Sequence, residues 1–294
     1  MARFSGERGL IPAHEFFVGI DSDGCVFNTM EVKQKQCFAP CFIKHFNLHQ
    51  IASIARETWE FVNLYASSRG CSRFEALSRT IALLKRRIDR SLYSDLLPDI
   101  EPLRQWMGKQ KIVSAASLKA CLDMYPDIFL QRVYSWSLAV DACISRTVRF
   151  VPPFALAIES LEFMRGRADV VVVSQTPHEA LVREWDTHGL TGYVQSIAGQ
   201  EGGTKSEQLY KAVRDRYPEG HMLMIGDAPG DLEAAKSIGA LFFPIIPGKE
   251  TQSWELLYHE ALGRFFSGCY AGTYEQELVQ AFSTLLPDNP PWEV

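Results

Sequence analysis

The segment FFVGIDSDG, residues 16–24, contains a short apolar run that ends in two aspartates separated by one serine. Five apolar or small residues in a row predict a strand that is buried on both faces. Alternate residues of an extended backbone point the same way, so the carboxylates of Asp21 and Asp23 are expected to converge. Burying like charges close together is costly, and a divalent cation is the simplest compensation. The alternative is a plain turn, because Asp-Gly pairs are common in loops.

A second stretch of the same kind lies far downstream. Residues 222–226, MLMIG, form another apolar run, and Asp227 and Asp231 follow it where a helical sequence begins. Acidic residues are favourable in the first turn of a helix, so capping alone accounts for either of them. Capping does not explain why both strands end in acidic pairs. Because ligands bind at the carboxyl ends of strands in open α/β sheets, four carboxylates gathered there predict a Mg²⁺ site.

Two further signals lie between these stretches. Residues 169–173, DVVVV, give the strongest strand prediction in the chain, and Ser174 follows them directly. Taken alone, a hydroxyl at a strand end favours turn or helix-cap chemistry. Lys205 opens a helical stretch that runs to residue 216, where the helix dipole disfavours a cation. A cation in that position indicates an anionic neighbour, although a solvated surface lysine is the simpler interpretation.

In this order, the four elements resemble the motifs of the haloacid dehalogenase-like superfamily of hydrolases. The resemblance depends on residues 21–24, on Ser174, on Lys205, and on the pair 226–227 with Asp231. Each element follows an apolar strand or opens a helix, as the pattern of that superfamily requires. Their combination and order are far more specific than any single element.

The residue at position 23 separates reaction types within that superfamily. Phosphatases and phosphomutases carry an acid there, as this chain does, whereas members that cleave carbon–halogen bonds generally do not. The resemblance therefore implies phosphoryl transfer. Cys25 stands where many members have threonine, and we treat this departure as mild because that side chain is not usually credited with chemistry.

The resemblance also implies a role for each motif residue. Asp21 is expected to be the nucleophile that forms an aspartyl-phosphate, and Asp23 to be the acid and then the base, for which its pKa should be raised. Ser174 and Gln175 are expected to contact the substrate, and Lys205 to neutralise charge on the transferring group. The expected Mg²⁺ ligands are Asp21, the backbone carbonyl of Asp23, and Asp227, with Asp231 supporting the metal site.

The pattern along the chain predicts two parts. Strands are expected near residues 16–21, 169–174, 193–198, 221–226 and 240–246, and they alternate with helices after residue 154. This alternation predicts an α/β fold with a doubly wound, Rossmann-like parallel sheet. Helices are expected over residues 31–46, 49–65, 72–88, 114–125, 127–144, 253–266 and 273–285. We therefore expect a core of residues 1–30 and 150–294, and a helical cap of residues 31–149 inserted into it.

One loop of the expected cap carries two arginines. Residues 67–73, SSRGCSR, lie between two predicted helices, and Gly70 permits a tight turn there. Arg69 and Arg73 are candidates for binding an anionic or polyhydroxyl substrate, because guanidinium groups bind phosphate and carboxylate well. A solvated loop is an equally good interpretation.

The composition limits the classes of function. The chain has 294 residues and a net charge of −5, so a general nucleic-acid interface is not expected. No apolar run approaches the roughly 20 residues that a membrane helix needs, and residues 1–8 lack the apolar core of a signal peptide. The seven cysteines form no metal-binding spacing. An odd count without a disulfide framework favours a reducing, cytoplasmic location.

These observations favour a Mg²⁺-dependent phosphatase that acts on a small phosphorylated metabolite. A phosphomutase would share every core residue named above, and a non-catalytic binding or regulatory protein would keep the fold alone. Loss of Asp21, Asp23, Lys205 or Asp227 would have favoured the non-catalytic alternative, and all four are present. Neither the substrate nor the oligomeric state, monomer or homodimer, follows from the sequence.

Overall fold

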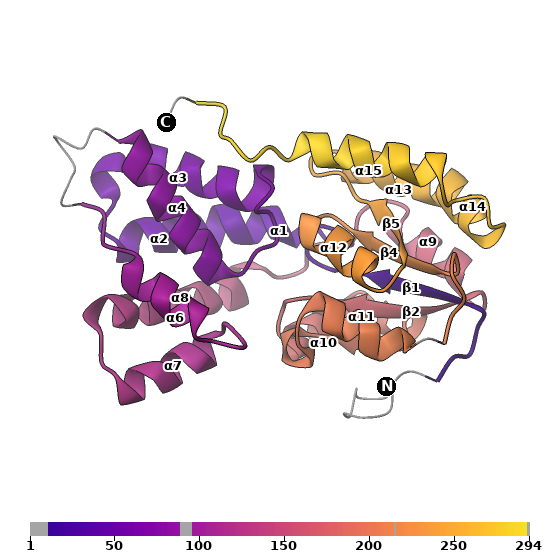
Figure 1. Cartoon of the computed structure of the whole chain (residues 1–294), viewed down its shortest axis with the longest axis horizontal. Helices are drawn as coiled ribbons and strands as arrows, with labels where there is room; N and C mark the ends of the chain where they lie inside the picture. Colours follow the sequence, from indigo (N-terminus) through magenta and orange to yellow (C-terminus); the bar gives the residue numbers. More distant parts are fainter. Residues whose placement is uncertain (1–10, 89–95, 215, 293–294) are drawn as a thin grey trace. The chain divides into compact units, whose positions relative to one another are not determined.

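Five parallel strands form one sheet within the residues that the computed structural model describes, which are 11–88, 96–214 and 216–292 (Figure 1). Residues 1–8, for which the sequence predicts no signal-peptide core, lie outside this range. The order of strands across the sheet is β3-β2-β1-β4-β5. The strands are β1 (Phe16–Ile20), β2 (Ala168–Val173), β3 (Ser196–Ala198), β4 (Met222–Gly226) and β5 (Leu241–Pro244). The predicted parallel α/β fold is confirmed.

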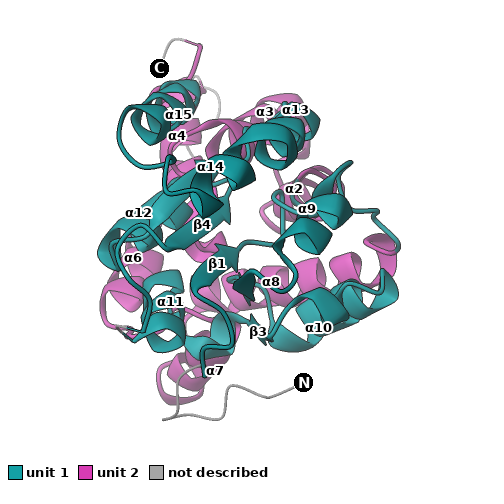
Figure 2. Cartoon of the chain, turned by 90° about the vertical axis from the view of Figure 1, so that its right-hand side faces the viewer, with its two compact units in different colours: residues 1–30, 150–285 teal, residues 31–149, 286–294 magenta. Residues whose placement is uncertain are grey.

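Helices cover both faces of this sheet, which explains why the strand sequences are continuously apolar. Every residue of β2 and β4 is buried. One face of the sheet packs on α9 (Ala157–Met164), α10 (His178–Thr187), α13 (Glu250–Leu256) and α14 (Leu262–Phe266). The other face packs on α11 (Lys205–Val213) and α12 (Pro229–Ser237), and Figure 2 shows these two groups on opposite sides of the strands. The sheet is therefore doubly wound.

The centre of the sheet brings distant segments of the chain together. Ile20 of β1 pairs with Val172 of β2 on one side and with Ile225 of β4 on the other. Gly19 lets α11 approach the sheet closely, because a Cβ there would lie 2.8 Å from the Leu209 side chain. The strand order reverses at β1, and ligands of doubly wound sheets bind at such a point, beyond the carboxyl ends of the strands.

The chain forms two compact units, which are residues 1–30 with 150–285 and residues 31–149 with 286–294 (Figure 2). The second unit is helical. Its helices are α2 (Ala39–His45), α3 (Ala52–Glu60), α4 (Arg73–Arg87), α6 (Glu101–Gly108), α7 (Ala115–Met124) and α8 (Ile128–Thr147), preceded by α1 (Thr29–Val32) at the boundary. Two π-helical stretches, Lys33–Phe38 and Phe61–Tyr65, continue α1 and α3. Of these helices, α6 was not predicted from the sequence.

Aromatic side chains fill the core of the helical unit. Trp59 and Trp136 are fully buried, and their ring centroids lie 5.7 Å apart in an edge-to-face arrangement. Phe42 packs on Trp59 with a centroid distance of 5.1 Å. Large rings of this kind bury much apolar surface each, so they dominate the stability of the unit. None of the helices in the described ranges combines the length and apolar character that a bilayer span requires.

The end of the chain packs with the helical unit, although the sequence pattern placed it with the core. Helix α15 (Thr273–Leu285) packs on β5 of the first unit, and residues 286–292 then contact the second. The backbone N–H of Ser67 donates to the Pro287 carbonyl at 3.2 Å, and the Arg87 guanidinium lies 3.9 Å from the centroid of the Trp292 ring. The chain therefore passes between the two units three times.

Trp292→Ala is expected to lower the free energy of unfolding of the helical unit by about 1–3 kcal/mol. The indole is partly buried, and its ring packs edge-to-face on Phe61 at 5.2 Å as well as on Arg87. Urea unfolding followed by circular dichroism measures this change. Trp292→Phe keeps an aromatic face and should recover much of the loss. An unchanged unfolding midpoint in the alanine variant would show that the C-terminal segment does not stabilise the unit.

Candidate active site

Three buried carboxylates meet where β1 and β4 end. Asp21 follows β1, Asp227 follows β4, and the backbone N–H of Asp21 donates to the Ile225 carbonyl at 3.0 Å. Asp231, from the first turn of α12, completes the group. One carboxylate oxygen of each aspartate lies within 4.8 Å of the others. The two acidic stretches that the sequence singled out are therefore brought together.

The local sequence explains how Asp231 reaches this position. Pro229 is the first residue of α12, where its missing N–H leaves no donor unsatisfied. The Asp231 carboxylate accepts from the backbone N–H groups of Asp227 and Ala228, at 3.2 and 3.0 Å. Gly226 is required for this arrangement, because a Cβ there would lie 2.4 Å from the Cβ of Asp231. Asp231 thus caps α12 and also faces the other two carboxylates.

Lys205 supplies the positive charge of the site. Thr204 caps α11 by accepting from the Glu207 backbone N–H, which places Lys205 in the first turn of the helix. The Lys205 ammonium lies 3.1 Å from an Asp21 oxygen, and it also forms an ion pair with Asp231. The anionic neighbours that its unfavourable place in the helix indicated are these two carboxylates.

The ionisation of the site reflects burial and crowding of charge. Burial raises the pKa of Asp21 well above its usual value, Lys205 opposes this, and the Asp231 and Asp227 carboxylates add to it. Burial alone would lower the pKa of Lys205, but the Asp21 and Asp231 carboxylates outweigh it, so the pKa is raised. Lys205 therefore stays charged at neutral pH, and one ammonium faces three acidic groups.

Two threonine hydroxyls hold the Asp23 side chain. Thr176 Oγ1 donates to one carboxylate oxygen of Asp23 at 2.5 Å, and Thr29 Oγ1 donates to the other. Thr29 begins α1, and Thr176 follows the end of β2. Neither threonine was predicted as a site residue from the sequence. A threonine in a loop has no distinctive pattern, so only the tertiary contact reveals its function.

Ser22, between the two aspartates, is fixed from α10. The Trp185 indole N–H donates to Ser22 Oγ at 3.0 Å, and Ser22 Oγ donates to Glu184 at 3.4 Å. Trp185 is fully buried, so its position is rigidly determined by the core. This contact fixes the turn that carries Asp21 and Asp23.

The predicted substrate-contacting residues of the first unit follow β2. Ser174 is buried, and its hydroxyl accepts from the Thr176 backbone N–H at 3.2 Å. Because β2 is the neighbour of β1, Ser174 lies at the same edge of the sheet as Asp21. The Gln175 side-chain amide donates to the Gly203 carbonyl at 3.0 Å. Gln175 therefore ties the loop after β2 to the turn before α11.

The predicted substrate arginines lie in the helical unit and make contacts within it. The Arg73 guanidinium pairs with Asp141 at 2.8 Å and donates to the Ser137 carbonyl and hydroxyl at 3.2 and 3.0 Å. Arg69 is buried and donates to the Leu64 carbonyl at 3.1 Å. These contacts give both residues a structural role. Their assignment to substrate binding stays a prediction.

Cys25, which departs from the superfamily pattern, is fully buried beneath the site. Its thiol donates to the Ile225 carbonyl at 3.7 Å. Burial, together with the nearby Asp227 and Asp21 carboxylates, raises the pKa of the thiol well above its usual value. Cys25 therefore stays protonated and serves as a small packing residue.

The donor set fits a hard divalent cation. Asp21, Asp227 and Asp231 offer oxygen ligands only, and oxygen ligands suit Mg²⁺. Their closeness places several negative charges together, and Lys205 alone does not balance them. Asp21 and Asp227 are the better candidates for direct ligands, because Asp231 is already engaged with Lys205 and with two backbone N–H groups.

Comparison with known proteins shows similarity of fold. No family model and no curated protein matches the sequence. A Bacteroides fragilis protein assigned as a haloacid dehalogenase-like hydrolase is 15% identical with a TM-score of 0.48, covering 81% of this chain and 92% of its own. A Lactobacillus delbrueckii subsp. bulgaricus protein assigned as a phosphoglycolate phosphatase is 14% identical, with a TM-score of 0.46 and coverage of 78% and 85%.

A third structure, a haloacid dehalogenase-like family hydrolase from Xanthomonas campestris, is 10% identical with a TM-score of 0.46, covering 91% of this chain and 96% of its own. Two of these three structures are named as haloacid dehalogenase-like hydrolases, and the Lactobacillus structure is named as a phosphoglycolate phosphatase. At these identities the similarity concerns the fold, and a fold carries no conclusion about activity.

Proposed function

We propose that this chain is a magnesium-dependent phosphatase that hydrolyses a small phosphorylated metabolite through an aspartyl-phosphate. The observation that carries the proposal is the contact of Asp21 with Lys205 beside Asp227 and Asp231. Two positions after Asp21 in the chain, the Asp23 carboxylate is held by hydroxyl groups. A nucleophile, a cation and a second acid are the groups that phosphoryl transfer needs. The motifs of the haloacid dehalogenase-like superfamily assign the same residues.

In the first step, an Asp21 oxygen attacks the phosphorus of a phosphate monoester. The new bond joins Asp21 to phosphorus, and the bond between phosphorus and the ester oxygen breaks. Asp23, in its protonated form, donates its proton to the leaving oxygen, so the alcohol departs neutral. The hydroxyls of Thr29 and Thr176 fix the direction in which the Asp23 carboxyl points.

In the second step, water attacks the phosphorus of the aspartyl-phosphate. Asp23, now ionised, accepts a proton from this water, and the bond between Asp21 and phosphorus breaks. The products are inorganic phosphate, the free Asp21 carboxylate and protonated Asp23. The enzyme returns to its starting state, and atoms and charges balance over the two steps.

Charge neutralisation is the remaining requirement, because an anionic carboxylate must approach an anionic phosphate. In this proposal Lys205 neutralises charge on the attacked group, and Ser174 hydrogen bonds a phosphoryl oxygen. A magnesium ion held by Asp21, Asp227 and the backbone carbonyl of Asp23 would offset the same repulsion when bound, with Asp231 supporting the site. Arg69, Arg73 and Gln175 remain proposed substrate contacts.

Asp23→Asn is expected to reduce turnover by about 10²–10⁴-fold, because a positioned acid and base is lost while the nucleophile is kept. Steady-state phosphate release measures the loss. Aryl phosphates with good leaving groups should lose less, since they need no proton from Asp23. Equal losses for good and poor leaving groups would argue against Asp23 as the acid.

The test of the proposal is a panel of phosphate esters, including sugar phosphates, nucleotides, phosphoglycolate and phospho-amino acids, assayed for phosphate release with and without Mg²⁺. Magnesium-dependent release from at least one ester is expected. Absence of turnover across the panel would favour the non-catalytic alternative. Transfer of the phosphoryl group back to substrate, stimulated by a bisphosphate, would indicate a phosphomutase.

A further inference from the structure

We propose that Gln208 is a positioning residue, which holds the strand end that carries Ser174 and the turn that precedes Lys205 at a fixed separation. This inference rests on the proposed phosphatase function. It adds a residue that no sequence motif of the chain indicates, because Gln208 lies within α11 and has no reacting group.

Three backbone carbonyls converge on the Gln208 side chain. Gln208 lies one turn after Lys205 in α11, and 2% of its surface is exposed. Its Nε2 lies within hydrogen-bond distance of the carbonyls of Ser174 at 3.2 Å, of Gly199 at 2.9 Å and of Gly203 at 3.0 Å, and its two hydrogens are shared among these three acceptors. These carbonyls come from the end of β2, from the residue after β3, and from the turn before α11.

Two of these carbonyls have a second donor: that of Gly199 accepts from the Gly202 backbone N–H at 2.8 Å, and that of Gly203 accepts from the Gln175 amide at 3.0 Å. The Ser174 carbonyl differs, because the Gln200 backbone N–H donates to the Thr176 carbonyl at 3.0 Å and not to that of Ser174. A buried carbonyl without a donor is costly, so the Ser174 carbonyl needs a donor from elsewhere. Gln208 supplies it from the helix that also carries Lys205.

The turn leaves little room for another arrangement. A Cβ at Gly199 would lie 2.5 Å from the His178 backbone nitrogen, and a Cβ at Gly202 would lie 3.2 Å from Gln208 Cγ. Gly203 has φ +105°, a conformation that other residues rarely adopt. The path of this turn is therefore set by close packing against α10 and against the Gln208 side chain.

The Gln208 amide faces the three carbonyls with its NH₂ group. Reversing the amide would direct Oε1 at three carbonyl oxygens, so the hydrogen-bond pattern assigns the NH₂ group to that side. Among the described residues, Gln208 Oε1 is buried and has no hydrogen-bond partner. The side chain is therefore used for its donors alone. A glutamate would set a carboxylate oxygen against the carbonyls, and a leucine would leave them without this donor.

The consequence for the site follows from geometry. Ser174 and Lys205 belong to different elements, and both must meet the same phosphoryl group. A misplacement of about 1 Å in a catalytic group costs on the order of 10²-fold in rate. The hydrogen bonds of Gln208 go to backbone carbonyls, whereas the candidate metal ligands follow β1 and β4. Loss of Gln208 should therefore disturb the phosphate side of the site and spare the metal side.

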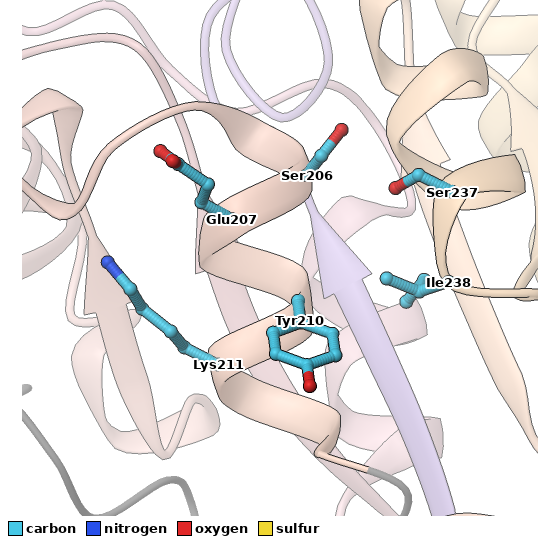
Figure 3. Close-up of a pocket in the computed structure, with 6 residues that line it drawn as sticks. All are labelled: Ser206, Glu207, Tyr210, Lys211, Ser237 and Ile238. Atoms are coloured by element: carbon cyan, nitrogen blue, oxygen red, sulfur yellow. The ribbon is translucent and has the colours of Figure 1, made fainter.

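The experiment compares Gln208→Leu and Gln208→Glu with Lys211→Met in the full-length protein. Lys211 also donates to a carbonyl of the same turn, that of Gly202 at 2.6 Å, but it is exposed on the surface of α11 beside the pocket in Figure 3. Three quantities are measured: kcat, Mg²⁺ affinity by calorimetry, and affinity for beryllium fluoride, a phosphoryl mimic, in the presence of Mg²⁺. Circular dichroism confirms that each variant folds.

In both Gln208 variants, kcat is expected to fall about 10²-fold and the affinity for beryllium fluoride at least about tenfold. The Mg²⁺ affinity should change less than about twofold. Lys211→Met should stay within about twofold of the wild type in all three. Folded Gln208 variants with wild-type kcat would overturn the inference. Parallel loss of Mg²⁺ and fluoride affinity would also overturn it, because general damage would then explain the result.

If neither Gln208→Leu nor Gln208→Glu folds, Gln208→Asn takes their place. Its amide keeps the donors but reaches less far, so it should fold and still lose kcat and fluoride affinity without losing Mg²⁺ affinity. An asparagine variant equal to the wild type would overturn the inference. A wild-type protein that binds neither Mg²⁺ nor beryllium fluoride would overturn the proposed function, and this inference with it.

Discussion

Asp21→Asn is expected to reduce phosphate-ester turnover at least about 1,000-fold, which corresponds to about 4 kcal/mol of transition-state stabilisation. The carboxamide has the shape of the carboxylate, but it is a very poor nucleophile, so no aspartyl-phosphate should form. Steady-state phosphate release, together with mass spectrometry of acid-quenched enzyme for the phosphoryl adduct, measures the loss. Asp186→Asn, which changes an exposed aspartate of α10, is the matched control and should behave as wild type.

Although Asp21→Asn should abolish activity, it is expected to stabilise the metal-free protein. Burial and the neighbouring carboxylates disfavour the ionised form of Asp21 more than Lys205 favours it, since its pKa is raised. An uncharged asparagine removes this cost, and Lys205 keeps its ion pair with Asp231. Thermal unfolding in chelator should therefore occur at a higher temperature for Asp21→Asn than for wild type.

An Asp21→Asn variant that keeps more than about a tenth of the wild-type turnover would exclude Asp21 as the nucleophile.

Asp21, Asp227 and Lys205 could be predicted from the local sequence, because each charged residue stands where the local structure alone would disfavour it. An uninterrupted apolar run before Asp21 predicts a strand with both faces covered, and a second run before Asp227 does the same. Parallel strands bring such ends to one edge of the sheet. Lys205 is predicted by its unfavourable place in a helix, and its contacts with Asp21 and Asp231 supply the physical reason.

The side chains that hold Asp23, Ser22 and the turn before Lys205 could not be predicted in this way. Thr176 contacts Asp23 from 153 residues away, and Trp185 contacts Ser22 from 163 residues away. Gln208 has the form of an ordinary helical residue. Threonine, tryptophan and glutamine are common in such positions for many reasons. Their roles depend on which strands become neighbours, and the local pattern does not encode that.

The helical unit illustrates a second limit. The periodicity located its long helices, yet it assigned the C-terminal residues to the core, because sequence order and a proline-rich composition say nothing about where an irregular segment packs. Trp292 packs on Arg87 and Phe61 in the structure. Arg73, expected at the substrate, is paired with Asp141 of α8. An arginine beside a glycine turn is compatible with either role until its partners are known.

Asp227→Asn is expected to weaken Mg²⁺ binding at least about 100-fold, because one anionic oxygen ligand becomes a neutral amide in a buried site. The effect can be measured without turnover. At a Mg²⁺ concentration of about 100 times the wild-type Kd, the ion should stabilise the wild type by about 2.7 kcal/mol and the variant by only about 0.4 kcal/mol. Thermal unfolding with and without Mg²⁺ reports this difference, and the ion's effect on turnover should move to higher concentration in parallel.

Glu233→Gln is the matched control, since it removes an exposed carboxylate from the same helix, α12, as Asp231. Long-range attraction of the cation would weaken similarly in both variants, whereas direct ligation concerns Asp227 alone. An Mg²⁺ titration of Asp227→Asn that matches the wild type would remove Asp227 from the metal site. The buried carboxylates would then need another partner, and Lys205 supplies only one positive charge to the group. Neutralisation by a cation is thus the simplest reason for three acids to share a place within 4.8 Å of one another.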